Sequence, residues 1–433
     1  MPKIDDAPFV WLNFDKRHQL LDVQESLRAL HKAIQKSQAT DLLIISHGWK
    51  TTKKQAARIY SEVWRHTKGY IPKDKTFVLA GVSWPALAFP VDFDGEAIRD
   101  AFAGATDAPP SGGHQDLDTE TFEKILRQSL PGEENKSLRN LFRQVEKDGT
   151  DQGNLKALAD GLAEHLRELS TESDPQLNDE IELIANEITR DPRVLLHVCR
   201  SPMITNEGGA SDLDAIARVF LGLTASLARF LNNFSYYAMK RRSGDIGISL
   251  GRHLDRQNFL QDIRVHLAGH SFGARLVTAS AAATSTLKLQ SLTLLQAAYS
   301  HYGLANNSPS GKGAFANALQ NRRVQGAIAI THTHNDLACK ILYPFASRFS
   351  GDGASEFGDA DDRYGAMGAN GAQFVNAIAH PDFPTNSKRL PVAGRVNNYL
   401  ADNVVKKIDG KTAAHNNIQN DGVGRLLAAA MSS

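Results

Sequence analysis

The stretch that decides the fold is LAGHSFGARL, residues 267–276, in which a serine stands between two glycines. Gly269, Ser271 and Gly273 match the pattern G-x-S-x-G, which carries a mechanism only where a strand precedes it and a helix follows. Residues 263–268 form a short apolar run typical of a strand, and residues 274–283 indicate a helix that is buried on one face. The sequence therefore predicts a strand, a sharp turn at Ser271 and a helix.

Strand-like runs recur along the chain and alternate with helical segments. They lie at residues 42–46, 77–82, 263–268, 292–297 and 324–331, with a weaker sixth run at 404–408. Several are nearly continuous runs of Val, Ile, Leu and Ala, as expected of parallel strands that are covered on both faces. The alternation predicts an α/β protein with a mostly parallel, doubly wound sheet.

One region interrupts this alternation. Residues 86–232 contain little strand signal, and their helical patterns are separated by polar, turn-rich stretches. We therefore expect a core of residues 1–85 and 233–433 and a large helical insertion of residues 86–232. The insertion either serves packing and solubility or forms a cap, and a protein partner, if there is one, would bind through it. Because it begins after a strand, at the edge where open α/β sheets bind ligands, we expect a cap that sets substrate size.

Composition argues against several classes of function. The 433 residues include 49 basic and 48 acidic side chains, so nothing in the charge balance indicates binding to nucleic acid or to an anionic membrane. Cys199 and Cys339 are the only cysteines, too few for a disulfide framework or a cysteine-based zinc site. No segment resembles a secretory signal or an integral membrane span. We expect a cytoplasmic protein with neither metal nor cofactor, and export by a route without a cleavable signal stays open.

A serine hydroxyl is a poor nucleophile, so Ser271 needs a base, a carboxylate that orients the base, and donors for an oxyanion. The backbone N–H of Phe272, the next residue, is one expected donor. The second is expected in the loop after an earlier strand, where HGW at residues 47–49 follows the apolar run LLIIS. Gly48 permits a close approach of the backbone, and the N–H of Trp49 is the candidate second donor.

The expected chain order of serine, acid and histidine locates the other two members of a triad. Asp336 lies in the turn after the strand that passes through Ile330, with an N-cap role for the next helix as the alternative. His415 follows the last strand-like run and precedes a terminal helix, so it is the preferred base. His380 and His47 are the alternatives, although His47 is better explained as a brace for its own loop.

Together these residues resemble the α/β-hydrolase superfamily, in particular bacterial serine esterases and lipase-like members. The resemblance covers the strand and loop at 42–49, VSWPA at 82–86, and the chain from Tyr236 onward, where YYAMKRRSGDIG precedes VHLAGHSFGARLV. It says nothing about the inserted residues 86–232.

The resemblance implies an α/β-hydrolase fold and a hydrolase of carboxylesters, with a small-molecule ester or lipid as substrate. Ser271 would be the nucleophile that forms an acyl-enzyme, Asp336 the acid and His415 the base. The same triad would serve a thioesterase or an amidase. A non-catalytic protein that uses this fold to bind a partner is the alternative from another class, because fold alone does not fix function. A complete triad favours the enzyme.

Overall fold

The computed structural model describes two compact units. Its described residues are 2–86, 119–197, 223–336, 338–342, 360–381, 390–406 and 414–433. The first unit, here called the sheet unit, comprises Met1–Leu87, Arg242–Tyr343 and Gly358–Ser433. The second, here called the helical unit, comprises Ala88–Arg241 and Pro344–Phe357. The division falls within one long helix, α10 (Leu223–Asp255).

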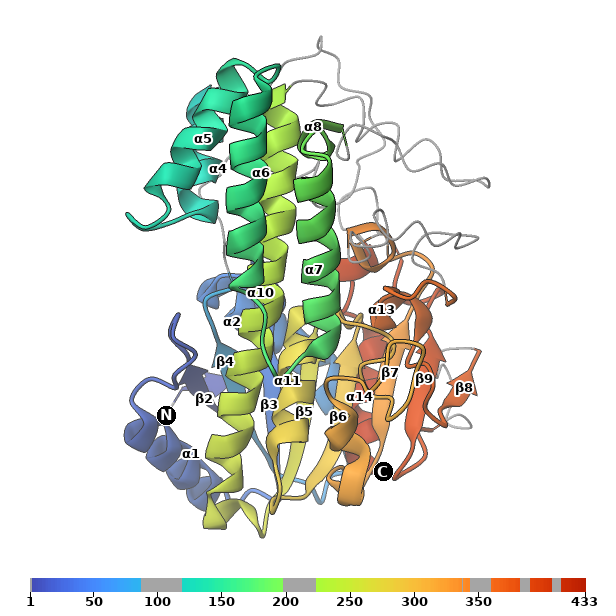
Figure 1. The fold of residues 1–433 in the computed structure, drawn as a ribbon. Helices are drawn as coiled ribbons and strands as arrows, with labels where there is room; N and C mark the ends of the chain where they lie inside the picture. The colour runs from blue at the N-terminus through green and yellow to red at the C-terminus, as the bar shows by residue number, and fades with distance from the viewer. Residues whose placement is uncertain are drawn as a thin grey trace, which may run out of the picture. The chain divides into compact units, whose positions relative to one another are not determined.

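The sheet unit is built on a single sheet (Figure 1), which has nine strands in the described part of the chain, in the order β1-β2-β4-β3-β5-β6-β7-β9-β8. The strands are β1 (Lys3–Ile4), β2 (Ala7–Asn13), β3 (Asp41–Ser46), β4 (Phe77–Ser83), β5 (Arg264–His270), β6 (Leu289–Leu295), β7 (Ile328–His332), β8 (Ile378–His380) and β9 (Val396–Leu400). The edge strand β1 is antiparallel to β2, and the pairings from β2 across to β8 are parallel. The prediction of an α/β protein with a mostly parallel sheet is confirmed.

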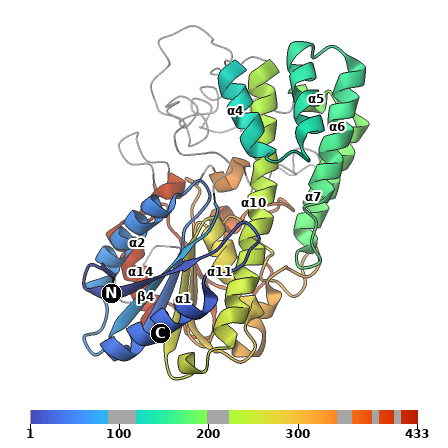
Figure 2. The same cartoon turned by 90° about the vertical axis from the view of Figure 1, so that its left-hand side faces the viewer.

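The central strands are buried along their whole length, which explains their unbroken apolar sequences. Every residue of β3 is buried, and so are all residues of β5 except the first. Such strands must be covered on both faces. Figure 2 shows α2 and α14 on one side of β4, and α1 and α11 on the other.

The helices of the sheet unit connect successive strands, except α14, which follows the last strand. They are α1 (Val23–Ser37), α2 (Lys53–Lys68), α10 from Arg242 onward, α11 (Phe272–Ala283), the short α13 (Met367–Asn370) and α14 (Asp421–Ser432). Helix α2 begins with a capping box, in which Thr52 accepts a hydrogen bond from the backbone of Gln55 and the Gln55 side chain accepts one from the backbone of Thr52. Gly424 places α14 directly against the backbone of His66 in α2.

The helical unit consists, within the described residues, of α4 (Thr119–Ser129), α5 (Lys136–Lys147), α6 (Gln152–Arg167), α7 (Pro175–Arg190), α8 (Val194–His197) and α10 up to Arg241. The leucines at helical spacing in α6 form part of its buried face. The buried helix expected over residues 213–231 corresponds to α10 from Leu223, and residues 213–222 lie outside the described residues. The role of the insertion as a cap stays a prediction.

The weak strand expected at residues 404–408 is wrong over residues 404–406, and residues 407–408 lie outside the described residues. The strand at this place in the sheet is β9, which ends at Leu400, and Val405 lies in the turn that follows. Two adjacent asparagines interrupt the apolar residues of β9, so this strand is not recognised as an apolar run. The side chain of Asn397 is buried because its amide donates hydrogen bonds to the carbonyls of Val392 and Arg395 and accepts one from the backbone of Val392.

Among the helices that the structure describes, none combines the length and the apolar character that crossing a bilayer requires.

Candidate active site

Ser271 occupies the sharp turn between β5 and α11. Its backbone has φ 57° and ψ −123°, a conformation that is rare for a residue with a side chain and costs free energy. The end of β6 and the loop after it hold Ser271 there, since the Ser271 N–H donates to the carbonyl of Leu295 at 3.0 Å and the Ala298 N–H donates to the carbonyl of Ser271 at 3.3 Å. The predicted strand, turn and helix are therefore present, with the serine at the point of strain.

Close packing requires both glycines of the motif. A Cβ added to Gly269 would overlap with the backbone of Gly273, across the turn. A Cβ added to Gly273 would overlap with the carbonyls of Ser46 and His47, at the end of β3. Any side chain at these two positions would push the start of α11 away from the sheet.

The turn lies at the topological switch point of the sheet. Strand β3 has β4 on one side and β5 on the other, so the chain leaves β3 in one direction and later returns on the other side. In open α/β sheets, ligands bind outside the carboxyl ends of the strands at such a point. The loops after β3 and β5, which carry Gly48 and Ser271, meet here. A Cβ on Gly48 would lie 2.8 Å from Ser271 Cβ and 3.3 Å from its Oγ.

The structure brings together the three residues of the expected triad. His415 Nε2 lies 2.9 Å from Ser271 Oγ, and His415 Nδ1 lies 2.7 Å from Asp336 Oδ2. Asp336 follows β7 and is completely buried, whereas the side chain of His415, in the short helix η5 (Ala414–Asn416), keeps 14% of its surface exposed. Both distances are those of hydrogen bonds. The arrangement can move a proton from the serine hydroxyl to an imidazole that a carboxylate orients.

The electrostatic surroundings keep Asp336 ionised. Burial by itself would raise the pKa of its carboxyl group, but the charge and the hydrogen bond of His415 outweigh burial and hold this pKa below its usual value. The backbone N–H of Cys339 also donates to Asp336 Oδ1, at 3.0 Å. A buried carboxylate of this kind stabilises the imidazolium that forms during acyl transfer.

Trp49 and Phe272, the residues expected to supply the oxyanion donors, lie beside the nucleophile. Phe272 is the first residue of α11, and the N–H groups at the start of a helix have no partner within it. The rings of Trp49 and Phe272 have centroids 6.2 Å apart. Their backbone N–H groups as an oxyanion hole stay a prediction.

His270 is a site residue that sequence reasoning missed. Its Nε2 lies 2.7 Å from the backbone carbonyl of His415, and the two rings have centroids 4.8 Å apart. Burial, followed by the charge of His415, lowers the pKa of His270 to about 3, so the ring is neutral at physiological pH. Since a carbonyl can only accept, Nε2 carries the proton and donates it. The signal available in the sequence was the position of His270 inside the G-x-S-x-G motif.

The two alternative bases have other hydrogen-bond partners. His47 is buried, its Nδ1 lies 2.9 Å from the carbonyl of Gly48, and Trp84 Nε1 donates to the His47 carbonyl at 3.1 Å. Burial lowers its pKa to about 4. These contacts agree with the expected role as a brace for the loop. His380 lies in β8 at the edge of the sheet, with Nε2 3.1 Å from Asn397 Oδ1.

Cys339 contributes a third ligand-type atom to the surroundings of the triad. Its sulfur and the nearest atoms of Asp336 and His415 lie within 4.8 Å of one another. A tetrahedral zinc ion holds oxygen and nitrogen ligands about 3.3 Å apart at bond lengths of about 2.0–2.2 Å. The 2.7 Å between His415 Nδ1 and Asp336 Oδ2 instead fits a shared proton. As placed, these residues form a hydrogen-bonded pair beside a buried thiol.

A second chain of serine, histidine and aspartate crosses the sheet near its opposite edge. His266 Nδ1 lies 2.9 Å from Ser291 Oγ, and His266 Nε2 lies 2.8 Å from Asp41 Oδ1. All three residues are fully buried, and Arg264 also pairs with the carboxylate. Because no substrate can reach a side chain that is closed off on every side, this array is structural. Exposure separates it from the site at Ser271.

Comparison with known proteins finds no family model, no curated protein and no solved structure that matches the chain.

Proposed function

We propose that the protein is a serine hydrolase of the α/β-hydrolase type, which cleaves a carboxylester through an acyl-enzyme on Ser271. The observation that carries the proposal is the pair of hydrogen-bond distances that join Ser271, His415 and Asp336 at the carboxyl edge of the sheet. The strained backbone of Ser271 supports it, because strain of this kind is found where a nucleophile must project from a turn.

In the first half of the reaction, the Ser271 hydroxyl oxygen attacks the ester carbonyl carbon and its proton passes to His415 Nε2. The carbonyl oxygen becomes an oxyanion, for which the N–H groups of Phe272 and Trp49 are the expected donors. When the tetrahedral intermediate collapses, the bond to the alcohol breaks and His415 returns the proton to the leaving oxygen. Asp336 stays ionised and orients the ring throughout.

In the second half, water repeats these steps on the acyl-enzyme. His415 accepts a proton from the water, whose oxygen attacks the acyl carbon, and the bond to Ser271 Oγ breaks as the serine recovers its proton. The products are a carboxylic acid and an alcohol. The sequence resemblance to esterases favours an ester substrate, and the expected cap would then select the length of the acyl chain.

The test uses a fluorophosphonate probe, which reacts with an activated serine. We expect the probe to label Ser271 in the wild-type protein, and the Ser271→Ala variant to lose both labelling and ester hydrolysis. Ser291→Ala is the matched control, because Ser291 also lies within hydrogen-bond distance of a histidine but is fully buried. This control should be labelled as fast as the wild type.

Two outcomes would contradict the proposal. A folded wild-type protein that the probe does not label is not a serine hydrolase, and it would fit the non-catalytic binding protein. Labelling without turnover of esters of graded acyl length, but with turnover of thioesters or anilides, would retain the nucleophile and replace the substrate class.

A further inference from the structure

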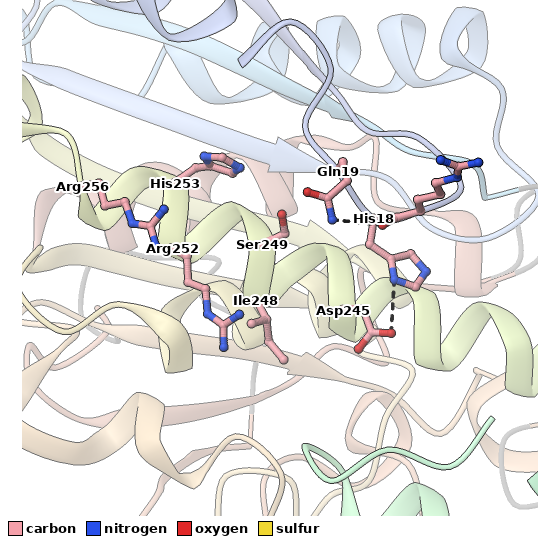
Figure 3. A pocket seen from close by; sticks show the side chains of 9 residues that line it. His18, Gln19, Asp245, Ile248, Ser249, Arg252, His253 and Arg256 are labelled. Atoms are coloured by element: carbon pink, nitrogen blue, oxygen red, sulfur yellow. Dashed lines mark hydrogen bonds and ion pairs between the residues drawn. The ribbon is translucent and has the colours of Figure 1, made fainter. Parts of the chain in front are cut away.

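A polar hollow lies in the sheet unit between the loop after β2 and helix α10, apart from the triad residues. It has a volume of about 470 Å³. Figure 3 shows Ser249 and His253 on α10 and Arg256 just beyond its end, with Gln19 and His18 facing the helix from the loop. The lining residues are Arg17, His18, Gln19, Asp245, Ile248, Ser249, Arg252, His253 and Arg256. The volume falls within the range of about 300–1,000 Å³ that small-molecule sites occupy.

Arginines dominate the charge of this pocket. None of the guanidinium groups of Arg17, Arg252 and Arg256 forms an ion pair with any residue that the structure describes. Arg252 lies in the last turn of α10 and Arg256 directly follows the helix, so two positive charges lie near the end of α10. The acid in the pocket, Asp245, lies 3.3 Å from His18 Nδ1 and so has a partner of its own.

The remaining lining is polar as well. Burial, followed by the charge of Arg256, lowers the pKa of His253. Ser249 and Gln19 offer a hydroxyl and an amide as hydrogen-bond donors, and Ile248 is the one aliphatic side chain in the lining. A ligand with a large apolar part would find little surface to contact here.

We propose that this pocket binds a small polyol that carries two or more phosphate groups, either as a free molecule or as the headgroup of a lipid. Guanidinium groups bind phosphate through pairs of parallel hydrogen bonds, and separate arginines can each hold a different phosphate. The volume exceeds what one phosphate needs, and the polar lining suits the hydroxyl groups of a polyol.

Isothermal titration of the full chain with inositol hexakisphosphate tests the proposal. We expect saturable binding to the wild-type protein and at least tenfold weaker binding to the double variant Arg252→Gln/Arg256→Gln. The matched control is Arg28→Gln/Arg58→Gln, which removes two charges from exposed positions on α1 and α2 outside the pocket. Circular dichroism shows whether each variant is folded. No binding to the wild type, or an equal loss in the control, would overturn the proposal.

Vesicles distinguish the two sources of the ligand. Phosphatidylcholine vesicles that contain phosphatidylinositol bisphosphate are compared with vesicles of equal charge made with phosphatidylserine. Binding to the phosphoinositide vesicles that the Arg252→Gln/Arg256→Gln variant loses assigns a lipid headgroup, and binding of the free polyphosphate alone assigns a soluble ligand. Equal binding to both vesicle types by wild type and variant would contradict a site at this pocket. None of these measurements uses turnover, so they stand apart from the proposed hydrolysis.

Discussion

The imidazole of His270 donates a hydrogen bond of 2.7 Å to the backbone carbonyl of His415, a residue 145 positions further along the chain. The residue that precedes the nucleophile therefore holds the loop that carries the proposed base. Because the donor is buried and neutral, the bond does not weaken as the pH changes around neutrality.

Removal of this bond should impair the base without removing it. We expect His270→Phe to lower kcat about 3- to 10-fold with little change in KM, since a neutral hydrogen bond contributes about 0.5–1.5 kcal/mol. His270→Gln, whose amide can donate to the same carbonyl, should recover part of the rate. The measurement is steady-state kinetics on a short-chain ester, with thermal melting to confirm the fold. A His270→Phe variant with full kcat would show that the contact does not position His415.

Asp336 should be essential for the rate. We expect Asp336→Asn to lower kcat by a factor on the order of 10⁴, because an amide cannot stabilise the imidazolium and favours the wrong tautomer of His415. Asp402 provides a matched control, since its carboxylate lies 2.8 Å from Nδ1 of the exposed His334. Asp402→Asn should retain wild-type kcat, and comparable losses in both variants would argue against the assignment.

The loop after β3 should not accept a side chain next to the nucleophile. In Gly48→Ala the new methyl group would lie 2.8 Å from Ser271 Cβ, closer than carbon atoms approach without displacement. We expect at least a 100-fold fall in kcat/KM for ester hydrolysis and slower labelling by the fluorophosphonate. Gly69→Ala is the control, because a Cβ there meets no atom within 4 Å. Equal activity in the two variants would mean that the loop can move away freely.

Stability should fall as the solution becomes acidic, because several histidines are buried in the neutral form. Burial lowers the pKa of His47 and His332 to about 4 and that of His270 and His301 to about 3. The unfolded chain takes up these protons first, near pH 6.5, so stability is complete above that pH and declines as pH falls toward 4. Each group contributes a slope of about 1.4 kcal/mol per pH unit in this window.

Urea unfolding between pH 7.5 and pH 4.5 measures this dependence. His301→Asn should reduce the dependence of the free energy of unfolding on pH by the contribution of close to one proton, since His301 is fully buried and stands outside the triad. A free energy of unfolding that stays constant over this range, or rises as the pH falls, would show that these rings are not held neutral in the fold.

The candidate triad could be predicted from the sequence because Ser271 and Asp336 follow apolar strands and the chain order of the three residues is fixed, although the strand expected directly before His415 was wrong. The G-x-S-x-G motif is local, so a short stretch around Ser271 specifies the strand, the turn and the helix. Asp336 and His415 follow β7 and β9, whose carboxyl ends meet at the same edge of the sheet as that of β5. A parallel sheet brings such residues together whatever their separation along the chain.

What could not be predicted depends on contacts between distant polar residues. Strand β9 contains Asn397, whose burial is possible only because its amide is satisfied by the backbone around it. The array of Asp41, His266 and Ser291 joins three strands, and no residue near any of them in the sequence signals it. The contact of His270 with the His415 backbone likewise depends on where a distant loop returns.

The buried array of Asp41, His266 and Ser291 has a consequence for how the sheet unit unfolds. The side chain of His266 in β5 contacts Asp41 in β3 and Ser291 in β6. Strand β5 is therefore held to both neighbouring strands by these side-chain contacts as well as by the backbone hydrogen bonds of the sheet. Its backbone amides should then be among the slowest in the protein to exchange with deuterium, and to exchange only when the whole domain unfolds. Ser291→Ala would remove the contact between β5 and β6, and the backbone amides of Leu267 and Ala268 should be the first to exchange faster with deuterium. Ser271 directly follows the carboxyl end of β5, so the proposed nucleophile is attached to the strand that we expect to unfold last.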